Sequence, residues 1–132
     1  LPENDLLCED LRSRDQSWDY CRHALAFFAA LPVDLAKLAP DDPRVGTEPG
    51  ANGNWCLADP NGSVFVIYLP EGGEAKLDLT DQSGTYTVSW FNPRTGEPGQ
   101  GTVATVKAGT TVALGTARTD PTEDWALLVQ GR

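Results

Sequence analysis

Short apolar segments separated by turn-forming residues fill the chain from Asn54 to Phe91. The intervening turns read DPNG at 59–62, EGG at 71–73 and DQSG at 81–84. Asp, Asn, Gly and Pro favour tight turns, whereas the Val, Ile, Tyr and Trp residues between them favour strands. This alternation is typical of antiparallel β-structure and constrains the fold more than any other feature of the chain.

Strand-like segments continue to the end of the sequence at the spacing expected of a β-sandwich. We therefore predict a mainly β fold, an antiparallel β-sandwich of about seven strands with an N-terminal α-helix packed on it. The expected strands cover residues 54–58, 63–69, 75–79, 85–91, 101–107, 111–115 and 124–130.

The segments 63–69 and 125–129 are apolar on both faces, so each needs a cover on its outer face. A helix is predicted from the capping box that begins at Ser13 to about Ala30, because Pro32 disfavours helical geometry before it. This helix is the one element long enough to be the cover, unless a domain outside this sequence covers these strands. Its apolar face is wider than a sandwich needs, which indicates that it also packs against something larger. The apolar row contains Trp18, Cys21, Leu25 and Phe28.

Proline and glycine residues divide the chain into two parts. Residues 1–53 are predicted to form an arm, the helix and a linker, with one helical turn near 33–38. Residues 54–132 are predicted to form the sandwich domain. The chain begins at Leu1 and contains no Met, so we expect a processed chain or a fragment of a longer protein.

The chain is acidic, with 19 Asp and Glu residues against 10 Lys and Arg residues and a net charge of −9. No basic stripe is present to neutralise phosphates, so nucleic acid is not an expected partner. No apolar run approaches the roughly 20 residues of a membrane span, so no membrane span is expected either. The length of 132 residues is enough for one ordinary core.

The three cysteines, Cys8, Cys21 and Cys56, fit no CxxC spacing, and the chain has a single histidine. A zinc site is therefore not predicted, and no cofactor is implied. Two interpretations of the cysteines stay open. Cys8 and Cys21 could form a disulfide in a secreted parent, or all three thiols could be buried as small hydrophobic groups.

No catalytic residues are predicted. His23, the only imidazole, is expected in mid-helix without a nucleophile motif nearby. The paired carboxylates lie in turn-rich segments, where acidic side chains serve local hydrogen bonding and solubility. The oxygen-rich loops 59–62 and 120–124 do not match the spacing of an EF-hand, so no metal site is predicted. The carboxylate groups considered were Asp41 with Asp42, Asp78 with Asp81, and Asp120 with Glu123 and Asp124.

Aromatic residues are the candidates for ligand binding, because flat rings stack on sugars as well as filling cores. Trp90 and Trp125 alternate with apolar neighbours and are predicted to be core residues. Trp55 follows a polar loop, while Phe91 precedes the Asn92–Gly96 turn. The predicted ligand-binding residues are Trp55, Phe91 and Arg94.

The sequence from about Trp55 to Val129 resembles the family described as the collagen-binding domain of a collagenase. The residues that carry the resemblance are the opening WCLA, the segment VIYLP followed by GG, the LDL segment, GTY, WFNPRTG and the closing DWALL. The upstream segments RSRD, WDY and RHALAFF are similar to the last barrel helix and exit of the proteins that contain this domain.

In this family the domain typically follows a glycoside-hydrolase-like (β/α)₈ barrel in secreted bacterial enzymes, some of which resemble plant-polysaccharide-degrading apiosidases. The resemblance therefore implies a non-catalytic C-terminal accessory domain of a secreted enzyme, extracellular or periplasmic. It would pack on the catalytic barrel, bind polysaccharide, or do both. The alternative is a collagen or extracellular-matrix binding domain. Any catalytic carboxylates of the barrel would lie before Leu1.

Overall fold

The computed structural model describes residue 23 and residues 26–31, 35–47 and 53–131. All predicted features at residues 1–22, including the capping box, Trp18, Cys8 and Cys21, lie outside these described residues, as does Leu25. Within the described residues, no helix is long and apolar enough to cross a membrane.

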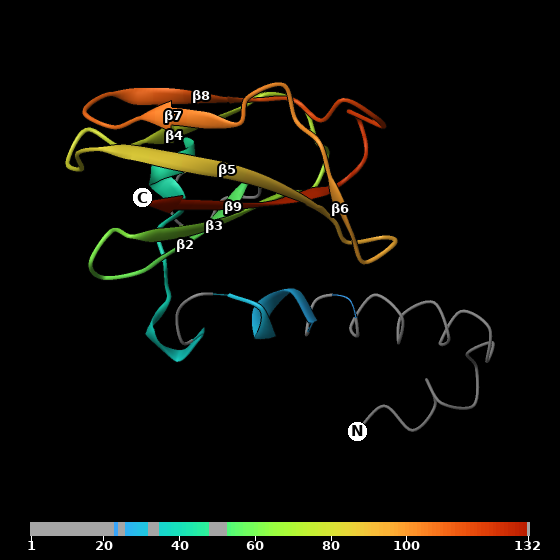
Figure 1. Cartoon of the computed structure of the whole chain (residues 1–132), viewed down its shortest axis with the longest axis horizontal. Helices are drawn as coiled ribbons and strands as arrows, with labels where there is room; N and C mark the ends of the chain where they lie inside the picture. The colour runs from blue at the N-terminus through green and yellow to red at the C-terminus, as the bar shows by residue number, and fades with distance from the viewer. Residues whose placement is uncertain (1–22, 24–25, 32–34, 48–52, 132) are drawn as a thin grey trace.

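Most strands belong to one large antiparallel sheet with the order β1-β2-β3-β9-β5-β6, in which β7 also pairs with β5 (Figure 1). The long central strands β3, β9 and β5 are rich in Val, Ile, Leu and aromatic residues, which favour pleated sheets. The strands of this sheet are β1 (Ala39–Pro40), β2 (Trp55–Ala58), β3 (Val64–Leu69), β5 (Thr85–Asn92), β6 (Glu97–Gly99), β7 (Thr105–Lys107) and β9 (Trp125–Gly131).

A second, two-stranded sheet pairs β4 (Ala75–Asp78) with β8 (Thr111–Gly115). Figure 1 shows β4 and β8 stacked on the opposite side of β3 and β9 from the N-terminal helical segment. One core fills the space between the two sheets, as expected of a sandwich. Its largest fully buried side chains come from both sheets and the turns beside them: Trp125, Phe65, Ile67, Leu69, Leu77, Leu79, Leu114 and Leu127.

The other face of the large sheet carries the helical segment at residues 26–29. The ring of Phe27 lies 4.8 Å from the ring of Phe91 on β5, measured between centroids. Phe27 and Phe28 together close an apolar hollow of about 180 Å³ over this face, which also involves Val66 and Ala126. The predicted mainly β fold with antiparallel sheets and a helix near the N-terminus is confirmed. The described part of the helix packs on the large sheet through Phe27 and Phe28, near Val66 of the strand at 64–69.

The segment at 101–107 differs from the prediction of one continuous strand, because only Thr105–Lys107 forms a strand there. Residues 100–102 direct their hydrogen bonds to the segment after β8 instead. The Thr102 amide donates to the Thr116 carbonyl at 2.9 Å, and the Arg118 amide donates to the Gln100 carbonyl at 2.8 Å. The chain here leaves β6 and crosses toward the second sheet, which alternation in the sequence cannot reveal.

The connector before the sandwich is more ordered than its proline content suggested. It contains the 3₁₀-helices η1 (Leu35–Lys37) and η2 (Asp42–Val45), and the short strand β1 between them. η1 falls within the predicted helical turn at 33–38. The strand β1 pairs with β2, with Ala39 opposite Ala58 and Pro40 opposite Leu57.

Candidate functional site

A row of paired residues crosses the outer face of the large sheet. Trp55 on β2 pairs with Tyr68 on β3, and Tyr68 pairs with Ala126 on β9. Ala126 in turn pairs with Phe91 on β5. Paired residues in a sheet project from the same face, so these four side chains form one line. The line has aromatic residues at both ends and a small residue between Tyr68 and Phe91.

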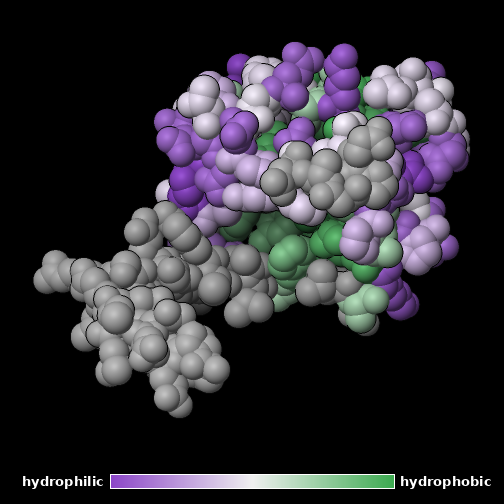
Figure 2. All heavy atoms as spheres, turned by 180° about the vertical axis from the view of Figure 1, so that it is seen from behind, coloured by the Kyte–Doolittle hydropathy of each residue, from purple (hydrophilic) through white to green (hydrophobic). Residues whose placement is uncertain are grey.

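Trp55 and Tyr68 are the exposed part of this row. Trp55 has 44% of its surface accessible and Tyr68 has 37%, and they are the exposed large hydrophobic residues of the described chain. Phe91 is half-buried because the ring of Phe27 lies against it. Figure 2, which views the molecule from behind, shows hydrophobic side chains gathered in its lower part, toward the helical segment, and hydrophilic ones above.

A hollow of about 390 Å³ lies beside the Trp55 ring. We call it the Trp55 hollow; its described lining is Gly53, Asn54, Trp55, Pro70 and Glu71. Trp55 also lines a smaller hollow of about 210 Å³ whose lining includes Tyr68 and Phe28. Trp55 therefore lines two depressions of the surface.

Tyr68 is fixed in place by an ionic network. Its hydroxyl donates a hydrogen bond of 2.8 Å to the Asp124 carboxylate, and Arg94 Nη1 donates to the same carboxylate at 2.7 Å. Burial, together with this hydrogen bond, raises the pKa of Tyr68 to about 12. Arg94 also donates to the Asp124 carbonyl, and its guanidinium lies 5.1 Å from the centre of the Trp125 ring. Arg94 thus acts inside the protein, holding the start of β9 to the turn after β5.

The three predicted ligand-binding residues therefore differ in their surroundings. Trp55 is exposed, and Phe91 is partly covered by Phe27. Arg94 pairs with Asp124 through Nη1, whereas its Nη2 is buried with no hydrogen-bond partner among the described residues. Their role in binding stays a prediction. Tyr68 was not among the predicted ligand-binding residues, although the alternation of its strand indicates an exposed position. Phe65, Ile67 and Leu69 alternate with it along β3, so Tyr68 must project from the opposite face.

His23 contributes to structure. Its Nδ1 lies 3.1 Å from the carbonyl oxygen of Pro93, and its ring packs against Gly96. A Cβ atom at Gly96 would lie only 2.7 Å from His23 Cδ2, so the turn requires glycine there for close approach as well as for its φ of +78°. The imidazole joins the N-terminal segment to the turn after β5.

Two carboxylates of the sequence motifs, Asp42 and Asp78, accept hydrogen bonds from nearby groups. Asp42 accepts a hydrogen bond of 2.8 Å from the Cys56 amide, and Asp78 accepts bonds from the Thr80 amide and hydroxyl at 3.0 and 2.6 Å. The bonds from Thr80 lower the pKa of Asp78. Such roles are those expected of acidic side chains in turns.

Arg44 on η2 joins three segments. Its guanidinium donates to Asp41 at 2.6 Å, to the Asp78 carbonyl at 2.9 Å and to both carboxylate oxygens of Asp81 at 2.8 and 2.7 Å. It also lies 5.1 Å from the centre of the Phe65 ring. The hydrogen bonds from Arg44 lower the pKa of Asp81 to about 2, and those to Asp81 and Asp41 raise the pKa of Arg44 despite its partial burial.

Cys56 is a free, buried thiol on β2, and burial is the main cause that raises its pKa to about 12. Among the described residues, no group of three or more His, Cys, Asp or Glu side chains could hold a metal ion. The possible disulfide between Cys8 and Cys21 lies outside the described residues.

Comparison with known proteins identifies the domain. The family model described as "Putative collagen-binding domain of a collagenase" matches residues 39–130, well over half of the chain. The chain belongs to this family. The match begins at β1 and ends within β9, so it covers both sheets of the sandwich. No curated protein matches the chain.

Two solved structures share the fold of this family member. A glycoside hydrolase of family 5 from Bacteroides vulgatus ATCC 8482 superposes with a TM-score of 0.68 at 12% identity, over 88% of this chain. A second glycoside hydrolase superposes with a TM-score of 0.61 at 12% identity, over 83% of this chain. The chain spans 24% of the length of each. At this identity the likeness shows the fold alone.

Proposed function

We propose that the chain is the non-catalytic C-terminal accessory domain of a secreted glycoside-hydrolase-like enzyme, where it packs on the catalytic barrel and binds polysaccharide. The observation that carries this proposal is that the same fold makes up about a quarter of two glycoside hydrolases. In both enzymes the remaining three quarters or so of the polypeptide lies outside the region that matches this chain. An extracellular or periplasmic location follows from the proposal.

The outer face of the large sheet supports the packing role. Val66 and Ala126 on this face are buried where the helical segment covers them, and Leu57 and Leu128 are half-buried. An apolar sheet face needs a cover, and the described helical segment supplies part of it through Phe27 and Phe28. A neighbouring catalytic domain would complete the cover.

The surroundings of the titratable groups support the non-catalytic role. His23 faces the Pro93 carbonyl, and Arg44 or Arg94 pairs with Asp41, Asp81 and Asp124. A general acid needs a pKa near the working pH, whereas the pKa of Asp81 is lowered to about 2. We expect the isolated chain to turn over neither aryl glycosides nor gelatin. Turnover that disappears on replacing His23 or one carboxylate would contradict this.

Binding to collagen or extracellular matrix is the second candidate, and the family description favours it. An acidic surface with a net charge of −9 suits a basic partner through charge complementarity. The aromatic row on the outer face favours saccharides equally well, since both ligands offer apolar surface. A pull-down with type I collagen fibrils and with insoluble polysaccharides separates the two.

The decisive experiment has two steps. The first is to read the gene upstream of Leu1, where we expect a (β/α)₈ glycoside-hydrolase-like domain. The second is to produce that domain separately and measure its association with this chain by analytical ultracentrifugation. Leu57→Asp on the outer face should weaken the association, while Lys107→Ala on the far side should not. An upstream sequence without such a domain, or two halves that fail to associate, would overturn the proposal.

A further inference from the structure

The Trp55 hollow joins an exposed aromatic wall to unoccupied polar side chains. Asn54 and Glu71 line the hollow, and within the described residues their side chains make no hydrogen bond or ion pair. Asn54 offers both a donor and an acceptor, and Glu71 offers acceptors. Exposing a Trp ring forgoes the favourable free energy of burying it, so a flat exposed indole beside free polar groups indicates a surface kept for a ligand.

The chemistry of this lining fits a saccharide. A pyranose ring presents C–H groups on its faces and hydroxyls around its edge, so it stacks on an indole while its edge exchanges hydrogen bonds with amide and carboxylate groups. The volume of about 390 Å³ lies within the range of small-molecule sites. Trp55 also lines the hollow that reaches Tyr68, so a chain of sugars stacked on the indole could extend into that hollow as well.

The negative charge around the hollow favours neutral over acidic saccharides as ligands. The described lining contains the carboxylate of Glu71 and no Lys or Arg. The chain as a whole carries a net charge of −9. A uronic acid or sulfated sugar would bring a further negative charge next to Glu71, which is unfavourable. Neutral sugars meet no such penalty.

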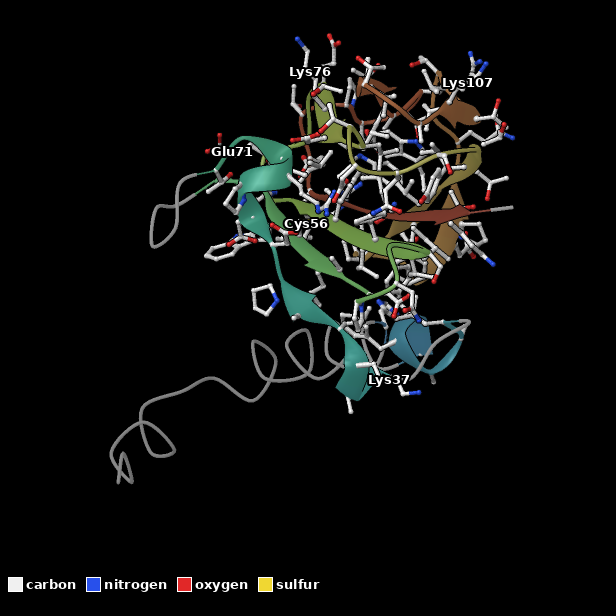
Figure 3. The ribbon with its side chains drawn as sticks, turned by 90° about the vertical axis from the view of Figure 1, so that its left-hand side faces the viewer. Lys37, Cys56, Glu71, Lys76 and Lys107 are labelled. Carbon is white, nitrogen blue, oxygen red and sulfur yellow. The ribbon has the colours of Figure 1, made fainter. Side chains whose placement is uncertain are left out.

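Rigidity of the second ring supports the same conclusion. Tyr68 lies opposite Trp55 in the sheet register, and its hydroxyl is held by Asp124, which Arg94 holds in turn. A ring fixed before binding loses little conformational freedom when a ligand arrives. Figure 3 shows Glu71 on the opposite side of the domain from Lys107, so the hollow and the β7 surface can be varied independently.

We propose that the Trp55 hollow is a binding site for a neutral oligosaccharide, with the Trp55 indole as the stacking wall, Tyr68 as a second aromatic contact, and Asn54 and Glu71 as hydrogen-bonding groups. The proposal rests on the accessory-domain function and names its site and ligand class.

Isothermal titration of the full chain with cellohexaose, xylohexaose and mannohexaose, and with oligogalacturonate as the acidic probe, tests the site. We expect at least one neutral probe to bind, and oligogalacturonate to bind more weakly. Trp55→Ala should weaken neutral binding by at least about tenfold, equivalent to ~1.4 kcal/mol. Tyr68→Phe keeps the ring and should retain most of the affinity, whereas Tyr68→Ala should lose more. Lys107→Ala is the matched surface control and should bind as the parent does.

The following outcomes would contradict the proposal that the Trp55 hollow binds a neutral oligosaccharide. The proposed binding site would be wrong if no neutral probe bound, or if Trp55→Ala left the affinity for neutral probes unchanged. Preference for oligogalacturonate would overturn the assignment to neutral sugars, and binding of type I collagen alone would favour the family's described ligand. Thermal melting of every variant separates lost binding from lost folding. These failures leave association with the catalytic domain unaffected, so they are distinguishable from failure of the accessory-domain function.

Discussion

Phe27 and Phe91 meet with their ring centroids 4.8 Å apart and their planes inclined at 44°. This contact joins the helical segment to the fifth strand across 64 positions of sequence, and the Phe27 ring also packs edge-on against Phe28 at 5.5 Å. Offset and tilted aromatic pairs of this kind contribute about 0.5–1.5 kcal/mol beyond their buried area. The contact is therefore a main anchor of the N-terminal segment on the sandwich.

Replacing Phe27 with Ser should destabilise the domain more than replacing Phe28 with Ser. Phe27 is half-buried against Phe91, so we expect a loss of about 1–2 kcal/mol in the free energy of unfolding, below the 3–5 kcal/mol typical of a fully buried ring. Phe28→Ser should mainly improve solubility. Urea unfolding and sedimentation velocity measure the two effects. Two silent substitutions would show that the helical segment adds nothing to the fold.

Trp90 and Trp125 are core residues, as the alternation of the sequence predicted. Their exposed fractions are 4% and 2%, and their ring centroids lie 6.0 Å apart in an edge-on arrangement. We expect Trp90→Ala and Trp125→Ala each to lower the free energy of unfolding by about 3–5 kcal/mol. Trp55→Ala is the matched control and should cost less than about 1 kcal/mol, since Trp55 is 44% exposed. Equal losses at all three positions in denaturant melts would contradict this assignment.

Gly72 and Gly73 provide a matched pair for testing close packing. Both have positive φ angles, +64° and +80°. A Cβ atom at Gly72 would collide with the backbone carbonyl oxygens of Pro121 and Glu123, whereas one at Gly73 would meet nothing within 4 Å. Each Ala substitution carries the backbone cost of about 1 kcal/mol, and Gly72→Ala should cost about 1–3 kcal/mol more. Thermal unfolding of both variants measures the difference; equal midpoints would mean that the 121–123 loop moves freely.

The Arg44–Asp81 pair should make stability depend on acid pH. The pKa of Asp81 is lowered from 3.8 to about 2, so the folded state favours the ionised carboxylate. Its contribution is present above about pH 4 and is lost as the pH falls through about 2. The melting midpoint of the parent should therefore exceed that of Asp81→Asn at pH 6, and this excess should shrink toward pH 2.

Salt provides the control for this pair, because Asp81 is exposed and its interaction is screened. We expect the difference between the parent and Asp81→Asn to shrink in 1 M NaCl at pH 6 as well. In Arg44→Gln the same Asp81→Asn substitution should have little effect at either pH. A parent–variant difference that is unchanged from pH 6 to pH 2 would show that Arg44 does not shift this carboxylate.

Local pattern was enough to predict most of the strands. The segment at 64–69 and the segment at 125–131 are long, apolar and bounded by turn residues, and both form strands close to their expected bounds. The short strands at 39–40 and 97–99 were not predicted, because each contains a proline and exists only through pairing with a longer neighbour.

The candidate site depended on information that a local pattern does not carry. Tyr68 lies between Trp55 and Ala126 in the sheet register. Tyr68 and Ala126 are 58 positions apart in the sequence, so their pairing leaves no local pattern. The ligand-binding role of Arg94 was predicted from its place in a turn and stays a prediction. Arg94 pairs with Asp124, which is 30 positions away, and no spacing rule connects the two.

The prolines at the margins of the large sheet have a consequence for how the domain meets other polypeptides. Pro40 lies on one margin strand and Pro98 on the opposite one, and neither can donate a backbone hydrogen bond. An incoming extended chain would find an interrupted ladder at either margin, which discourages strand addition and sheet-to-sheet aggregation. Copies of the domain at high local concentration would therefore be less prone to pair their sheets edge to edge.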